Sequence, residues 1–256
     1  SFISLLKNRF QEMAVTYNAV GNWPIDQLAI APQDFLYIEV WPFTPHYTDL
    51  LRIVQEGRQK SGGNPVVIAL YQPAEWLENV RLTDAVIMAS GGSRIEIGEN
   101  GRLLTDPYFP NHSAISDELR STLTRYHDFL VRYGDLIGPQ AEDEVDIAVH
   151  APEGVRIVPR ISQGWLVINL INFSGQGDAH WDKAHSAPKP IENATVLISG
   201  VDNIERVYLA SPDMDDLTLH EADWWYKSGS VTINLQRLDY WTLVAVKTNK
   251  TSPVDG

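Results

Sequence analysis

The sequence predicts a mixed fold in which one half of a (β/α)8 TIM barrel is followed by an antiparallel β-sandwich. In the first half of the 256-residue chain, short apolar runs alternate with helical patterns, as in a parallel sheet buried on both faces. In the second half, short strand-like runs are separated by turn residues, which is typical of stacked antiparallel sheets. A complete barrel takes about 250 residues. The part that precedes the sandwich, residues 1–138, is therefore long enough for half a barrel.

Four runs rich in apolar, β-branched or aromatic residues predict the strands of the parallel sheet. They cover residues 14–20, 35–41, 65–71 and 84–92. Helical patterns lie between them, most clearly at residues 47–59 and in a shorter stretch at 74–79. A long amphipathic helix is predicted at residues 116–133, where apolar side chains form one stripe.

The start of the chain bears on the rest of the barrel. Ser1 is followed by a helix-like apolar repeat at residues 3–13, with no initiator Met and no signal-peptide pattern. A half barrel alone would leave the edges of its parallel strands unpaired, which compact domains avoid. We therefore expect the chain to begin inside a longer gene product, with the other half of the barrel upstream of Ser1.

Seven short runs separated by turn residues predict the strands of the sandwich. They cover residues 145–149, 155–159, 165–173, 194–199, 206–210, 231–235 and 240–246. An acidic segment with glycine and proline at residues 138–144 marks the boundary. The predicted organisation is a barrel half at 1–138, a sandwich at 139–247 and a disordered tail at 248–256.

Charge and composition exclude several classes of function. With 33 Asp and Glu against 20 Lys and Arg, the net charge of −13 disfavours nucleic acid and anionic membranes as partners. No uncharged apolar run is long enough to predict a membrane span. The absence of Cys excludes disulfides, thiol catalysis and zinc sites with Cys ligands. The 8 Trp and 10 Tyr lean towards a carbohydrate ligand, because aromatic rings stack on the C–H faces of sugars, although core packing accounts for most such rings.

Glu39 is the main candidate for a catalytic residue. It lies near the C-terminal end of a predicted strand, the end at which the active sites of barrel enzymes are found. Tyr37 and Trp41 flank it with aromatic surface, the kind of surroundings that raise the pKa of a Glu towards general-acid duty. The alternative is a structural carboxylate paired with Lys, Arg or backbone N–H groups.

Polar and aromatic residues also end the neighbouring strands. Asn18 occupies the matching end of the preceding strand and is suited to bind a sugar hydroxyl or, alternatively, to close the turn. Tyr71 ends the third strand and is a candidate wall of the same pocket. Together with Trp41 and Glu96, these residues form the predicted substrate-binding set.

Glu96 belongs to a glycine-rich stretch, residues 91–99, that follows the fourth predicted strand. The stretch has neither a GxGxxG pattern nor the Lys of a P-loop, so nucleotide binding is rejected. We interpret Glu96 as a polar group beside a cleft, with an ion pair to Arg94 as the alternative. The His residues do not cluster in sequence, and His180 and His185 fall in a predicted polar loop of the sandwich, so neither a catalytic metal nor a cofactor is expected. Glycoside hydrolysis by a carboxylate pair fits best, with one carboxylate of the pair visible.

A set of segments in consistent order along nearly the whole chain carries a resemblance to a known family. The segments are residues 17–20 (Tyr-Asn-Ala-Val), 34–41 (Asp-Phe-Leu-Tyr-Ile-Glu-Val-Trp), 67–71, 91–99, 108–111, 126–131, 171–174, 210–213 and 240–241. On these segments the chain resembles glycoside hydrolase family 66. The family comprises endo-dextranases and cycloisomaltooligosaccharide glucanotransferases, which act on α-1,6-linked glucan with retention.

The resemblance implies roles and partners. Glu39 matches the acid/base Glu of the family's Tyr-x-Glu-x-Trp run, after strand six, so the four predicted strands become strands five to eight of the barrel. The family's Asp nucleophile follows strand four, and no Asp of this chain matches it, so it is expected upstream of Ser1. The implied partners are α-1,6-glucan, such as dextran and isomaltooligosaccharides, and the upstream half of the same barrel. Because cells meet dextran outside, a secreted enzyme is expected.

Three interpretations stay open: an endo-dextranase, a cycloisomaltooligosaccharide glucanotransferase, and an inactive glucan-binding fragment that lacks the nucleophile. The glucanotransferases that the chain resembles carry a carbohydrate-binding module between strands seven and eight. Residues 71–84 form only a short link at that place, which favours the hydrolase.

Overall fold

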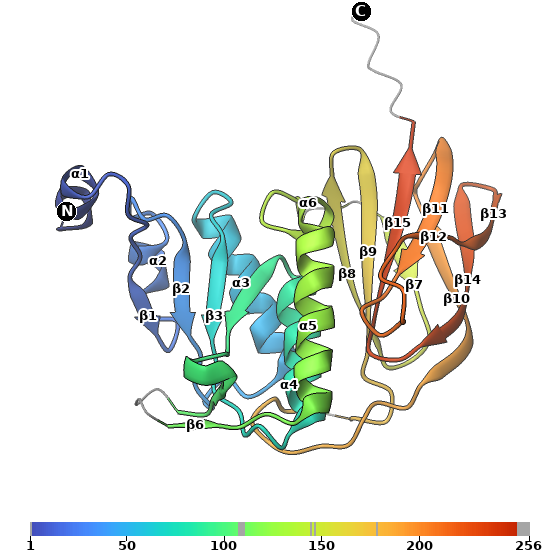
Figure 1. The fold of residues 1–256 in the computed structure, drawn as a ribbon. Helices are drawn as coiled ribbons and strands as arrows, with labels where there is room; N and C mark the ends of the chain where they lie inside the picture. The colour runs from blue at the N-terminus through green and yellow to red at the C-terminus, as the bar shows by residue number, and fades with distance from the viewer. Residues whose placement is uncertain (1, 107–110, 144, 146, 178, 250–256) are drawn as a thin grey trace, which may run out of the picture. The chain divides into compact units, whose positions relative to one another are not determined.

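The computed structural model describes residues 2–106, 111–143, 145, 147–177 and 179–249 (Figure 1). The chain forms two compact units. The first, here called the parallel unit, comprises residues 1–124 and 178–185, and the second, the antiparallel unit, comprises residues 125–177 and 186–256. The predicted domain limits at 138 and 247 stay predictions. The two units divide between residues 124 and 125, inside one long helix, and residues 178–185 belong to the first unit.

The parallel unit is built on a four-stranded sheet with the order β1-β2-β3-β4, in which all neighbours are parallel. Its main elements are α1 (Phe2–Arg9), β1 (Asn18–Val20), α2 (Ile25–Leu28), β2 (Leu36–Glu39), α3 (Tyr47–Lys60), β3 (Val66–Ala69), α4 (Leu77–Ala89), β4 (Gly92–Ile95), the short pair β5 (Leu103–Leu104) and β6 (His112–Ser113), and the long helix α5 (Asp117–Arg132), which continues into the antiparallel unit. The first three strands and the helices α3 and α5 lie where the sequence predicts them.

The fourth predicted strand, residues 84–92, is wrong. Residues 77–89 form helix α4, and the strand β4 begins only at Gly92. The cause is burial: α4 is enclosed on nearly all sides from Asn79 to Ala89, so its sequence lacks the polar face by which a helix is usually identified. A continuous apolar run does not distinguish a buried helix from a buried strand.

One face of the parallel sheet packs against helix α3. Gly57 of α3 lies so close to the sheet that a Cβ atom there would stand 3.4 Å from Ile38 and 3.6 Å from Leu36. Since successive residues of a strand point to opposite faces, Tyr37 and Glu39 of β2 point away from this helix. Strand β2 therefore directs apolar side chains towards the helix, and it directs Tyr37 and Glu39 to the other face of the sheet.

The antiparallel unit contains two sheets, with the orders β13-β14-β10-β7 and β12-β11-β15-β9-β8. Its elements are α6 (Gly134–Ile137), β7 (Ala148–His150), β8 (Val155–Ser162), β9 (Trp165–Asn172), β10 (Ile191–Ser199), β11 (Ile204–Ala210), β12 (His220–Glu221), β13 (Asp223–Lys227), β14 (Ser230–Leu238) and β15 (Trp241–Thr248). One hydrophobic cluster draws on both sheets, with Ile168 from β9, Val196 from β10 and Ile233 from β14. The sheets therefore share a core.

The sequence missed β12 and β13, because the run Asp223-Trp224-Trp225-Tyr226-Lys227 is short and charged at both ends. Of the predicted disordered tail, Thr248 ends β15, and residues 250–256 lie outside the described residues. Among the helices that the structure describes, none is both long and apolar enough to cross a membrane.

Candidate active site

Glu39 is the last residue of β2 and is 5 % exposed. The register of the sheet places it opposite Val20 of β1 and Ala69 of β3, and its carbonyl accepts a hydrogen bond from the N–H of Gly21 at 2.8 Å. The residue that follows, Val40, continues the ladder to β3. The backbone that carries the Glu39 side chain is thus held on both sides by neighbouring strands.

Two side chains from the adjacent strands hold the carboxyl group of Glu39. Asn18 Nδ2 donates to Oε2 at 3.1 Å, and the hydroxyl of Tyr71 donates to Oε1 at 3.0 Å. The structure therefore brings together three residues that the sequence predicted to meet at the strand ends. The two donors fix the orientation of the carboxyl group.

Burial raises the pKa of Tyr71 well above its usual value, and the hydrogen bond to Glu39 and the charge of Glu39 raise it further. Tyr71 therefore remains a protonated donor throughout the neutral range. Burial also raises the pKa of Tyr37, again with a contribution from Glu39, while a hydrogen bond with Tyr71 acts in the opposite sense. Tyr37 was not in the predicted binding set, although its place two residues before Glu39 puts it on the same face of the strand.

Trp41 lies beside this group. Its ring is 6.5 Å from the ring of Tyr71, centroid to centroid, with an edge-on orientation. The indole Nε1 of Trp41 is buried and has no hydrogen-bond partner among the residues that the structure describes. An unused donor beside a carboxyl group and two phenols is suited to a hydroxyl-rich ligand, because a buried donor is costly to leave unpaired.

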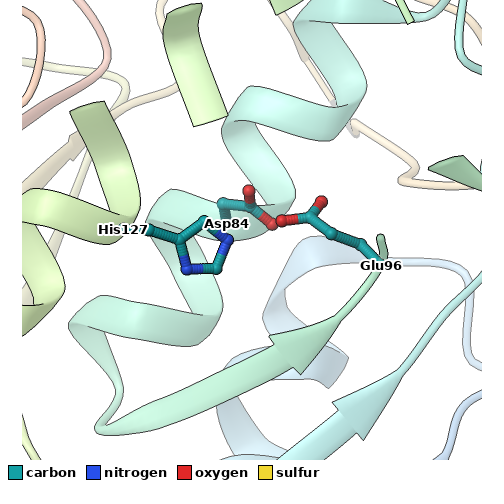
Figure 2. Close-up of side chains that lie close together, drawn as sticks. All are labelled: Asp84, Glu96 and His127. Atoms are coloured by element: carbon teal, nitrogen blue, oxygen red, sulfur yellow. The ribbon is translucent and has the colours of Figure 1, made fainter. Parts of the chain in front are cut away.

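Glu96 lies in a buried ion cluster instead of beside an open cleft. Arg94 Nη1 lies 3.1 Å from a carboxylate oxygen of Asp84 on α4 and 3.3 Å from one of Glu96, and all three side chains are at most 1 % exposed. Figure 2 shows the carboxylates of Asp84 and Glu96 pointing towards one another. The ion pair that the sequence left as the alternative is thus present. Arg94 supplies the positive charge that lets two carboxylates approach in the interior.

The same cluster supports the neighbourhood of Glu39. Arg94 Nη2 donates to the carbonyl of Leu70 at 3.2 Å, and Leu70 directly precedes Tyr71. Helix α4, strand β4 and the end of β3 are therefore tied together by one guanidinium group. Its geometric contribution is to fix the backbone from which the Tyr71 side chain projects.

A segment from far along the chain supports the loop that carries Trp41. Trp181 is 2 % exposed; its N–H donates to Pro45 at 2.9 Å and its Nε1 donates to Thr44 at 2.7 Å. Thr44 in turn donates to the carbonyl of Trp41 from both its N–H and its hydroxyl, each at 3.1 Å. The loop after β2 is thus fixed by residues that the sequence assigned to the sandwich.

Helix α4 and α3 hold the rest of this segment. Asn79 Nδ2 donates to the carbonyl of Lys183 at 2.7 Å, while its Oδ1 accepts from the N–H of His185 at 3.2 Å. The rings of His46 and His180 lie 4.4 Å apart, although the two residues are far apart in the sequence. The sequence gives no sign of this contact, because the contact depends on residues 179–185 belonging to the parallel unit.

Comparisons with known proteins agree with this architecture. A family model described as "Glycosyl hydrolase family 66" matches residues 1–245. A cycloisomaltooligosaccharide glucanotransferase of Niallia circulans is 26 % identical over an alignment of 197 residues, with 69 % of this chain and 20 % of that protein covered. The chain thus spans about a fifth of the length of the curated relatives that it matches.

Two solved structures resemble the fold. The first is a Paenibacillus sp. cycloisomaltooligosaccharide glucanotransferase complexed with cycloisomaltoheptaose, with a TM-score of 0.85 and 18 % identity, covering 94 % of this chain and 57 % of that one. The second is a GH30 endoxylanase from Clostridium papyrosolvens C71, with a TM-score of 0.51 and 14 % identity, covering 96 % of this chain and 59 % of that one. Because the family model matches nearly the whole chain, the chain belongs to glycosyl hydrolase family 66.

Proposed function

We propose that this chain carries the acid/base part of the active site of a retaining glycoside hydrolase, an endo-dextranase that cleaves internal α-1,6-glucosidic linkages. The observation that carries the proposal is the carboxyl group of Glu39, held by Asn18 and Tyr71 at the C-terminal end of a parallel strand. Active sites of barrel enzymes gather at that end of the strands. Membership of the family makes a glycosidic bond the target.

In this mechanism Glu39 first donates a proton to the departing glycosidic oxygen while a second carboxylate attacks the anomeric carbon. Glu39 then removes a proton from the incoming water, which releases the glucosyl group from that carboxylate. Retaining enzymes need the two carboxyl groups only about 5–5.5 Å apart. The Nε1 of Trp41, which has no hydrogen-bond partner among the described residues, is a donor for a sugar hydroxyl bound beside Glu39.

The second carboxylate is proposed to come from an upstream half of the same barrel. The parallel sheet has its strands in sequential order, helix α3 on one face and Glu39 on the other. This arrangement fits one side of a (β/α)8 barrel, followed by a β-sandwich in the antiparallel unit. The nucleophile is then an Asp that this chain does not contain, and the partner segment completes the barrel mouth.

A cycloisomaltooligosaccharide glucanotransferase is the second candidate, because the relatives named above carry that description. The link of residues 70–76 between β3 and α4 is short, which favours the hydrolase. The products distinguish the two: a cyclic oligosaccharide is lighter than the linear one of equal length by one water. Mass spectrometry of the products from dextran therefore decides, and cyclic products would overturn the dextranase assignment. Secretion is part of the proposal because dextran is extracellular.

The test of the site is Glu39→Gln in the complete enzyme. General acid–base catalysis contributes about 10²- to 10⁴-fold, so the hydrolysis rate on dextran should fall by that factor. Glu205→Gln is the matched control, since Glu205 pairs with Lys247 on the surface of the antiparallel unit. Hydrolysis by the Glu39 variant at near the wild-type rate would remove Glu39 from the mechanism.

A further inference from the structure

The sheet β13-β14-β10-β7 has one face on the hydrophobic core and one face in solvent. Trp224 of β13 packs against the core, so Trp225 projects from the opposite face because successive strand residues alternate. Trp225 is 47 % exposed. Among the eight tryptophans, all of which the structure describes, only Trp23 and Trp225 are exposed to such an extent.

The register shows what surrounds this indole. Trp225 pairs with Thr232 of β14, Thr232 with Leu197 of β10, and Leu197 with His150 of β7, which gives one row across four strands. The adjacent rows carry hydroxyl and amide side chains on β14 and β10 and end in Asp223 and Lys227 on the edge strand β13. We call this solvent-facing surface the outer face; it comprises His150, Thr195, Leu197, Ser199, Asp223, Trp225, Lys227, Ser230, Thr232 and Asn234. With strands about 4.8 Å apart, the row is about 14 Å long.

Several polar groups of the outer face are held in place. Asn234 Nδ2 donates to Asp223 Oδ2 at 2.8 Å, and the hydroxyls of Ser199 and Ser230 lie 2.8 Å apart. Each of these groups keeps lone pairs or protons for a further partner. The strands thus present a fixed grid of amide and hydroxyl groups beside one aromatic ring.

Charge and polarity identify the class of ligand. The charged side chains of the outer face, Asp223 and Lys227, have opposite signs and both lie on the edge strand β13, so β14 and β10 contribute neutral side chains to the face. Contiguous apolar patches mark protein interaction sites, whereas the outer face has two large apolar side chains, Trp225 and Leu197. A neutral polymer with many hydroxyls matches both the grid and the ring, because sugar C–H faces stack on indole.

We propose that the outer face binds a stretch of α-1,6-glucan chain, as a second site on a different unit from the Glu39 pocket. The choice of glucan as ligand rests on the proposed function, while the geometry of the face does not. Trp225 supplies the stacking surface and the rows of Thr232 and Asn234 supply the hydrogen bonds.

The experiment is native electrophoresis of the 256-residue chain in gels with and without dextran. Dextran should retard the chain, and Trp225→Ala should weaken the apparent affinity roughly tenfold, as for an aromatic anchor. Trp225→Tyr should restore part of the retardation. Met214→Ala is the matched control, because Met214 is 48 % exposed on the same unit but outside the outer face.

Glu39→Gln in the same gel separates this proposal from the proposed function. Retardation that is kept in Glu39→Gln and in Met214→Ala but lost in Trp225→Ala supports the second site, whatever the catalytic result. Equal retardation of Trp225→Ala and wild type overturns it, as does wild-type mobility that dextran leaves unchanged. A dimer in sedimentation that Trp225→Ala dissociates would also overturn it, since the face would then bind a second copy of the chain.

Discussion

The carboxyl group of Glu39 meets two donors of different character. The pKa of Tyr71 is raised by burial and by Glu39, so its hydroxyl keeps its proton and stays a donor to Oε1. The amide of Asn18 donates to Oε2 but offers an acceptor after rotation. When the carboxyl group carries a proton on Oε2, the amide of Asn18 can rotate and accept a hydrogen bond from it.

Tyr71→Phe in the complete enzyme removes one hydrogen bond to a charged group, worth about 1.5–3 kcal/mol. We expect kcat to fall about 10- to 100-fold, because the carboxyl group of Glu39 loses a donor that fixes its orientation. The measurement is kcat on dextran. Tyr226→Phe, which loses a hydrogen bond to Asp202 at 2.9 Å instead, should leave kcat unchanged. A wild-type kcat for Tyr71→Phe would contradict this role.

For single residues, the sequence predicts the place of a side chain in the fold better than its hydrogen-bond or ion-pair partner. The strand ends predicted that Asn18, Glu39 and Tyr71 lie together, because parallel strands end at one edge of a sheet. Tyr37 was recoverable from the alternation of the strand. The partner of Glu96 was not, because whether a carboxylate faces a cleft or Arg94 depends on the packing of α4.

At the scale of elements, burial decides where sequence patterns fail. The sequence predicts a strand where residues 84–89 continue helix α4, because the polar side chains of this helix, Asn79, Thr83 and Asp84, are themselves buried and bonded to other segments. They do not mark a solvated face. The amphipathic helices α3 and α5 were predicted correctly since each keeps exposed polar residues.

Residues 179–185 contribute to stability through Trp181. Trp181→Ala should lower the free energy of unfolding by about 3–5 kcal/mol, because a fully buried indole leaves a cavity and its hydrogen bond to Thr44 is lost. Urea denaturation of the 256-residue chain measures it. The matched control is Trp225→Ala, which removes the same side chain from the surface and should cost less than about 0.5 kcal/mol. Equal costs for the two variants would contradict the contacts of Trp181.

At the scale of the whole molecule, the proposed half site has a direct consequence. The 256-residue chain on its own should release no isomaltooligosaccharides from dextran, because the proposed attacking carboxylate belongs to the upstream half of the barrel. Adding the upstream half of the barrel as a separate chain should restore activity, measured by mass spectrometry of the products. Linear products from the 256-residue chain alone would show that a nucleophile is already present.

Because Trp181 belongs to the parallel unit, that unit cannot be completed until residue 181 has been translated. Its carbonyl accepts a hydrogen bond from Asn79, a residue 102 positions earlier in the chain. At a synthesis rate of 5–20 residues per second, the ribosome needs roughly 5–20 s to make the intervening segment. During that interval helix α4 has left the ribosome without its eventual partner. The first unit therefore stays incomplete until residues 125–177 of the second unit have been translated.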